Sequence, residues 1–147
     1  AGGMGPRGTA DYMESKGLHP GLANVVVAGL AELVSGVLLV MGFLTPLAGV
    51  LMFAVITVAL VVEHLPNGMW ESNGGVEYPL LLLGSLFALV CTGPGAWSVA
   101  HAAGVEPSGW RWGVVTFALG LAGSAAAIAL GRLAARRGRS AGSTSVV

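Results

Sequence analysis

Five side chains that can exchange protons or hold a polar ligand lie in or beside the apolar stretches of this sequence. Glu32 is near the middle of the apolar run that starts at residue 21. Thr57 and His64 lie in the next apolar run, Asn73 comes just before the third, and Glu77 begins the third. Groups of these types could bind the head of a ligand and move its protons, provided that the fold brings them together.

Glu32 is the most informative of these residues. A carboxylate near the bilayer midplane costs several kcal/mol unless it is neutral, paired or hydrated, so we expect it to face protein or a small cavity rather than lipid. The positions three and four residues away carry the small residues Ala28, Gly29, Ser35 and Gly36, and such a face packs closely on another helix. Two interpretations follow: a protonated, hydrogen-bonded structural glutamic acid, or a ligand and proton site.

The second apolar run ends in two ionisable residues. His64 titrates near neutral pH and can donate, accept or ligate, although it could equally mark the end of a helix at the membrane interface. Thr57 lies seven residues earlier and is predicted to share its helical face. Glu63 points elsewhere, and exposure to water is a sufficient explanation for it.

Glu77 begins the third apolar run, where a carboxylate interacts favourably with the helix dipole. The loop joining the two runs brings Glu77 and His64 to the same face of the membrane, and Glu32 could lie below them. The sequence therefore predicts a polar pocket at this face. Asn73 is expected either to cap the third helix or to contact a ligand.

Composition places these residues in a membrane protein. Of the 147 residues, 54% are hydrophobic and 10% are charged, whereas a soluble domain has about 25% charged residues. The formal net charge is zero, which argues against nucleic-acid binding. The single cysteine, Cys91, allows no internal disulfide and no zinc motif. The scattered histidines predict neither a metal site nor a haem pair, with ligation by Glu32, His64 and Glu77 a remote alternative.

Four apolar runs are long enough, or nearly so, to cross a bilayer, which takes roughly 20 residues. They are residues 21–43, 46–64, 77–92 and 110–131, of which 77–92 is the shortest. The predicted fold is an all-α, integral membrane helical bundle with four transmembrane helices. Helix 110–131 carries small residues four apart, a pattern of packing or oligomerising faces.

The basic residues predict the orientation and the flanking segments. Residues 1–20 form a loop-like segment, and residues 132–147 form an Arg-rich tail that is expected to be disordered. These two segments share one side with the loop after His64. That side is predicted to be cytoplasmic by the positive-inside rule, because it holds six of the seven Lys and Arg residues: Arg7, Lys16, Arg132, Arg136, Arg137 and Arg139.

Several motifs, taken in order, carry a family resemblance over residues 2–100. They are the opening GPRGTADYMESKGLHPG, the helix-embedded Glu32, the helix-ending His64, the NGG-x-E motif (Asn73, Gly74, Gly75, Glu77) and the closing GPG-x-x-S motif (Gly93, Pro94, Gly95, Ser98). In these residues the sequence resembles the DoxX family of small bacterial membrane proteins.

Three features depart from the family pattern. Family members usually open with a further transmembrane helix, and this sequence starts just after that point, so the resemblance implies a helix that was truncated or lost. The family core commonly ends soon after the GPG motif, which makes 110–131 an extension. The sequence FLTP also stands where TR is common.

The resemblance implies a helical bundle of the bacterial inner membrane associated with quinone-coupled sulfur oxidation, quinol oxidases or oxidative-stress complexes. The first hypothesis is a quinone-linked redox component, an oxidoreductase subunit with no redox centre of its own. Glu32, His64 and Glu77 would bind the quinone head, and electrons would come from a partner. The alternatives are a non-catalytic scaffold that anchors redox enzymes and, third, a small proton-coupled transporter. The chain is expected in the lipid bilayer as a homo-oligomer or as a subunit of a larger complex.

Overall fold

The computed structural model describes residues 5–105 and 107–143, with side chains described as far as residue 137. Regular structure in these ranges is helical throughout. The main helices are α1 (Gly5–Ser15), α2 (Gly21–Met41), α3 (Thr45–Ala59), α4 (Glu77–Thr92), α5 (Val99–Ala102) and α6 (Trp110–Ser143). A π-helical turn, Leu60–His64, extends α3, and short 3-10 turns at Leu65–Asn67 and Glu71–Asn73 form the loop to α4.

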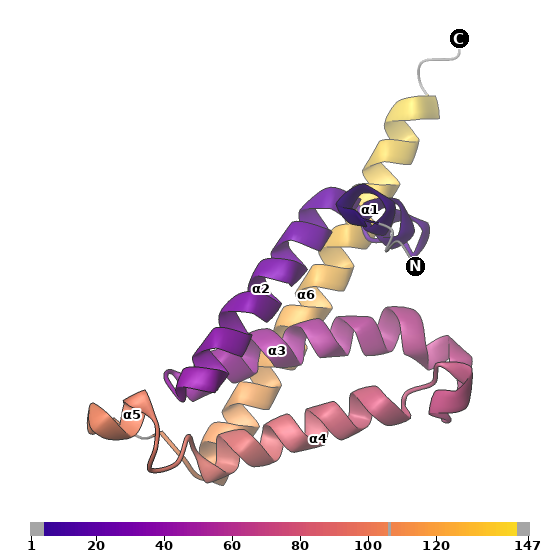
Figure 1. Ribbon diagram of the computed structural model, residues 1–147. Coiled ribbons are helices and arrows are strands. Elements are labelled where there is room, and N and C mark those ends of the chain that lie inside the picture. The colour runs from indigo at the N-terminus through magenta and orange to yellow at the C-terminus, as the bar shows by residue number, and fades with distance from the viewer. Residues whose placement is uncertain (1–4, 106, 144–147) are drawn as a thin grey trace.

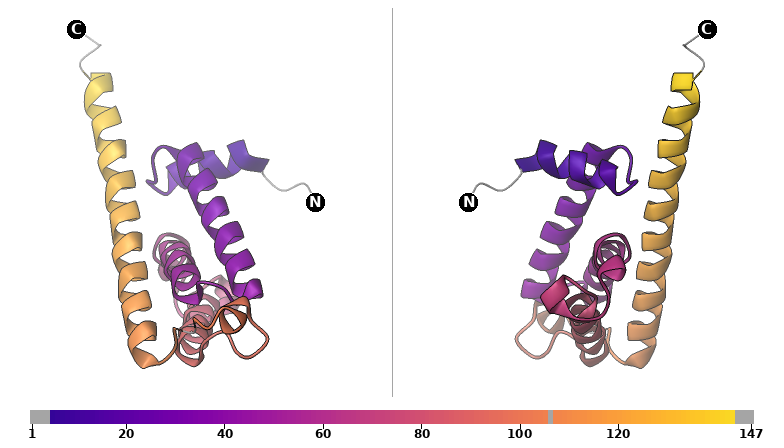
Figure 2. Two further views of the ribbon diagram at one scale, coloured as in Figure 1. Left: turned by 90° about the vertical axis from the view of Figure 1, so that its left-hand side faces the viewer. Right: turned by 90° about the vertical axis from the view of Figure 1, so that its right-hand side faces the viewer.

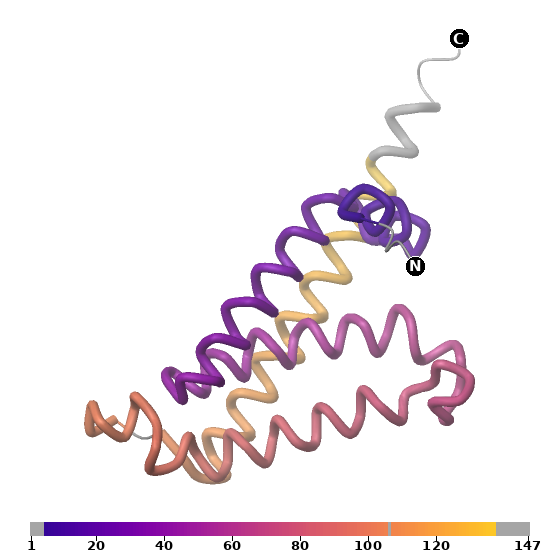
Figure 3. The backbone as a smooth tube through the Cα atoms, viewed as in Figure 1, coloured from indigo at the N-terminus to yellow at the C-terminus, as the bar shows by residue number. Residues whose placement is uncertain are grey.

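Helix α3 lies at the centre of the bundle, with α2 on one side and α6 on the other (Figure 1, Figure 2). Helix α4 runs back alongside α3 and also packs on α6. The loop between α3 and α4 closes this hairpin at the end far from α5 (Figure 3). Helix α1 lies across the first turns of α2 (Figure 2).

The core lies where α3, α4 and α6 meet. Phe53 of α3 is fully buried, and its ring makes an edge-to-face contact with Phe117 of α6 at a centroid distance of 5.2 Å. Phe117 makes a second edge contact with Phe87 of α4. Aromatic pairs favour this geometry because the positive ring edge meets the negative ring face. Leu83 and Leu86 complete the cluster around Phe53.

The turn from α2 to α3 depends on Gly42. Its φ of 60° is left-handed, and the N–H groups of Gly42 and Phe43 donate to the carbonyls of Leu39 and Leu38, which satisfies the end of α2. A Cβ here would also lie 2.5 Å from the Cβ of Ser98. Ser98 itself caps α5, since its Oγ accepts a hydrogen bond from the His101 N–H, so the short α5 is held against this turn.

In the described part of the chain, three helices have the length and composition of membrane spans: Gly21–Met41, Thr45–Asn67 and Trp110–Arg137. The protein is therefore a multi-pass membrane protein with an all-α fold, as predicted. Helix α4 is apolar but has only 16 residues, about 24 Å at 1.5 Å per residue. This is shorter than the roughly 30 Å hydrocarbon core, so the count of four transmembrane helices stays a prediction.

Both flanking segments contain more helix than predicted. Residues 5–15, expected to form a loop, make up α1, and Ala10 is its buried residue. Helix α6 continues beyond residue 131 to Ser143, into the segment 132–147 that was expected to be disordered. That stretch is rich in Ala and Arg, which have high helix propensity. Residues 144–147 lie outside the described part of the chain.

Candidate functional site

Glu32 is exposed on the outer side of α2 and does not face another helix, contrary to the prediction. The side of α2 that packs on α3 is marked instead by Ser35, which is fully buried and lies 4.0 Å from the sulfur of Met52. A Cβ added at Gly29 or Gly36 would meet nothing within 4 Å. The small residues next to Glu32 thus leave open space rather than a helix contact.

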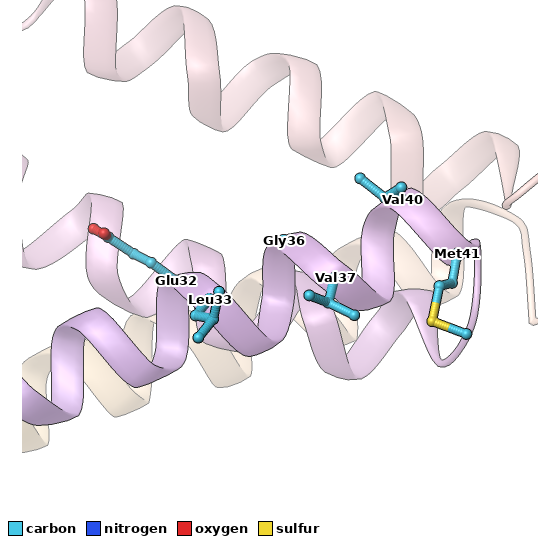
Figure 4. Close-up of a pocket in the computed structure, with 6 residues that line it drawn as sticks. All are labelled: Glu32, Leu33, Gly36, Val37, Val40 and Met41. Carbon is cyan, nitrogen blue, oxygen red and sulfur yellow. The ribbon is translucent and has the colours of Figure 1, made fainter.

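A groove of about 370 Å³ follows this open side of α2. Its lining comes from α2 alone, and Figure 4 shows the side chains along the helix toward its C-terminal end. Glu32 is the one ionisable residue of the lining; the others are Leu33, Gly36, Val37, Val40 and Met41. The groove surface is therefore almost wholly apolar, and the Glu32 carboxylate extends away from the other lining residues at one end (Figure 4). The lining contains neither His64 nor Glu77, so this groove is not the predicted pocket of all three residues.

His64 contacts the loop that follows it. Its Nδ1 lies 2.8 Å from the carbonyl oxygen of Gly74, which also accepts a hydrogen bond from the side chain of Asn67 at 3.2 Å. Because a carbonyl can only accept, Nδ1 donates in this contact. The contact ties the end of the π-helical turn to the loop before α4.

Glu77 lies at the start of α4, where its Oε2 accepts a hydrogen bond from the backbone N–H of Glu71 at 3.1 Å. The loop folds back on itself through two more backbone bonds, from Val76 to Gly68 and from Glu77 to Met69. Asn73 does not cap α4, because the capping position is Val76 and no side chain bonds there. Asn73 is exposed in the 3-10 turn before it.

Thr57 and His64 do not share a face, because the helix changes its winding between them. The Leu65 N–H donates to the carbonyl of Leu60, five residues earlier, which is the bond of a π-helix. Thr57 is buried inside the bundle, and its hydroxyl has no hydrogen-bond partner among the residues that the structure describes. His64 is half-buried and turned to the loop.

The cluster that sequence reasoning missed joins α1 to the π-helical turn. The Glu63 carboxylate accepts a hydrogen bond from the hydroxyl of Tyr12, and its Oε2 lies 3.0 Å from the Nζ of Lys16. Tyr12 lies in α1, and Lys16 follows its last residue, Ser15. The Lys16 N–H still donates to the Tyr12 carbonyl, so the two residues lie on one side of the helix end. An assignment of residues 5–15 as a helix would have pointed to this pair. Glu63 is thus an anchor for α1 rather than a merely solvated residue.

The cluster shifts the pKa values of Tyr12 and Lys16. The hydrogen bond to Glu63 is the main cause that raises the pKa of Tyr12 above its usual 10.0, and the same carboxylate raises the pKa of Lys16 above 10.5. Groups with raised pKa values stabilise the fold fully below their unfolded pKa values and lose this contribution as the pH rises through the folded ones. The attachment of α1 should therefore persist at neutral pH and weaken in strong alkali.

Titration of Tyr12 tests this cluster. The sequence has two tyrosines, so in a Tyr78→Phe background the phenolate absorbance reports Tyr12 alone. We expect a pKa above the usual value, and a lower pKa when Glu63 is also replaced by glutamine, since the neutral amide no longer disfavours the phenolate. Equal titration curves with and without Glu63 would contradict the contact.

The part of the sequence that contains the groove and the cluster is similar to known proteins. The family model described as DoxX matches residues 2–65, which include Glu32 and the Tyr12–Lys16–Glu63 cluster. The inner membrane protein YphA of Escherichia coli (strain K12) is 30% identical over 105 residues, which are 65% of this chain and 72% of that protein. No solved structure matches the chain.

Proposed function

Because this chain belongs to the DoxX family of membrane proteins, we propose that it binds a quinone as a component of a membrane redox complex. The observation that carries the proposal is the groove on α2, an apolar surface with Glu32 as its one ionisable residue at one end; in Figure 4 the Glu32 carboxylate extends away from the other lining residues. Ligand sites of this kind are mostly apolar and orient the ligand with a few polar groups.

The groove suits a ligand that arrives through the lipid. Glu32 is exposed in the middle of α2, so a quinone could approach sideways within the bilayer. A protonated Glu32 would donate a hydrogen bond to a quinone carbonyl, while Val37 and Val40 would contact the apolar part of the ring and tail. We assign His64 and Glu77 to ordering the loop instead, on the basis of their contacts with Gly74 and Glu71.

Reduction of a quinone to a quinol takes up two electrons and two protons. Glu32 would pass protons to the head group one at a time. Cys91 is the only thiol of the chain; it lies near the end of α4 and does not line the α2 groove. The electrons would therefore come from a partner enzyme, and the chain would act as the quinone-binding subunit.

The test is the quinone retained by protein purified in mild detergent. We expect about one quinone per chain in the wild type, and about tenfold less with Glu32→Ala, since a hydrogen bond to such a group is worth roughly 1–2 kcal/mol. The control is Glu71→Ala, which removes an exposed carboxylate of the loop. Retention that is unchanged in Glu32→Ala would refute the proposal.

A second candidate is a scaffold that anchors redox enzymes at the membrane. It is favoured by α6, which extends past the level of α1 (Figure 2) and carries Arg132, Arg136 and Arg137 near its end. If this end is cytoplasmic, as its charge suggests, it would present basic groups to soluble partners. Affinity purification that recovers a redox enzyme with the wild type, and not after Arg132 and Arg136 are changed to glutamine, would support this candidate; no reproducible partner would oppose it.

A further inference from the structure

A second groove, of about 610 Å³, lies between α6 and the turn that joins α1 to α2. In Figure 2 this turn reaches across toward α6, and Leu18 of the turn packs close to Gly131 of α6. The groove is lined by His19, Pro20, Asn24, Ala127, Leu130, Gly131, Leu133, Ala134 and Arg137. It is therefore made by two segments far apart in the sequence.

The groove lies at the edge of the apolar layer. Helix α2 begins its apolar span at Gly21, and the uncharged stretch of α6 ends at Gly131, just before Arg132. His19 and Asn24 flank the first of these boundaries, and Arg137 lies outside the second. This is the level at which lipid phosphates lie, just outside the hydrocarbon core.

The lining has a polar end and an apolar end. On α6, Ala127, Leu130, Ala134 and Arg137 recur at spacings of three and four, so they form one face of the helix. The apolar members lie deeper in the span, and the cation lies at its outer end. A groove of this pattern matches a molecule with a negative head and an apolar chain.

The charges around the groove favour an anion. Arg132 and Arg136 are exposed on the same end of α6 as Arg137. The Glu14 carboxylate accepts a hydrogen bond from the Gly21 N–H at 2.7 Å and lies 3.7 Å from Nδ1 of His19. The formal charges named here, three arginines and one carboxylate, sum to a positive value.

We propose that this groove binds an anionic phospholipid of the surrounding bilayer. The phosphate would contact Arg137. Further donors would be Nε2 of His19, whose Nδ1 faces Glu14, and the second amide N–H of Asn24, whose first donates to the Pro20 carbonyl. An acyl chain would lie along Leu130 and Ala127. Basic pockets beside transmembrane helices bind anionic headgroups in this way. The lipid would join α6 to the α1–α2 turn. The site is separate from the α2 groove, so the inference does not rest on quinone binding.

The experiment uses the full chain in nanodiscs that contain phosphatidylcholine with a minority of phosphatidylglycerol, and native mass spectrometry after release counts the bound lipids. We expect one phosphatidylglycerol to be retained preferentially by the wild type. Arg137→Gln should lower that retention about fivefold, as expected for the loss of one cation near the surface. Ala134→Leu should lower it as well, by filling the groove without changing the charge.

The control is Arg111→Gln, which removes a cation from the opposite end of α6 and should leave retention unchanged. Equal losses in Arg111→Gln and Arg137→Gln would show that lipid retention depends only on the net charge of the protein, and would contradict a specific site in this groove. Unchanged retention in Arg137→Gln would do the same, as would full displacement of the lipid by free glycerophosphate, which lacks the acyl chain.

Discussion

Replacing Gly120 with alanine should destabilise the bundle by about 1–3 kcal/mol relative to the same change at Gly123, the range found for overpacked cores. A Cβ at Gly120 would overlap the Cβ of Phe53 and come within 3.3 Å of the Val50 carbonyl. Phe53 is fully buried and cannot move aside without disturbing its contact with Phe117. Small residues of this kind allow two membrane helices to approach closely.

Gly123→Ala is the matched control. It lies three residues further along α6, where a Cβ would make an ordinary contact of 3.5 Å with Ala54. Both substitutions gain the same helix propensity over glycine, so the difference between them isolates the overlap with Phe53. Reversible unfolding of both variants in mixed micelles measures this difference. Equal stabilities would contradict the packing of α3 against α6.

Replacing Gly36 with leucine should abolish quinone binding without unfolding the protein. Gly36 lines the groove beside Glu32, and a Cβ there would meet nothing within 4 Å. A leucine side chain would therefore occupy the groove rather than disturb the core. Because the carboxyl group stays in place, the variant separates the shape of the groove from its proton chemistry. Quinone retention in purified protein is the measurement.

Gly29→Leu provides the comparison for Gly36→Leu. Gly29 is also exposed on α2 with open space around it, yet it is not part of the groove lining. We expect this variant to keep the quinone of the wild type. A loss of quinone in both variants would indicate a general effect on α2 and would argue against a local site.

The fold was largely predictable because apolar run length is a strong signal in a membrane protein. The run 77–92 matches α4, and the start of α6 falls at residue 110 as expected. The N-terminal helix was missed because Gly5, Pro6 and Gly8 are typical of loops. The contacts that hold α1 in place are visible in the structure alone: Ala10 is buried, and Tyr12 donates a hydrogen bond to Glu63.

The site was less predictable, because it depends on the helical winding at the end of α3 and on which side of α2 no other helix covers. A face argument based on an α-helix fails across the π-helical turn, which separates Thr57 from His64. The same turn directs Glu63 to Lys16 while His64 meets Gly74. The small residues around Glu32 suggested a covered face, but spacing alone does not say whether a neighbouring helix is there to cover it.

Photoaffinity labelling with an azidoquinone, followed by peptide mapping, tests the central claim most directly. The proposal predicts saturable labelling within residues 32–41, reduced by excess unlabelled quinone and absent in Gly36→Leu. Saturable labelling confined to the loop around His64 and Glu77, or no saturable labelling at all, would contradict a quinone site on α2.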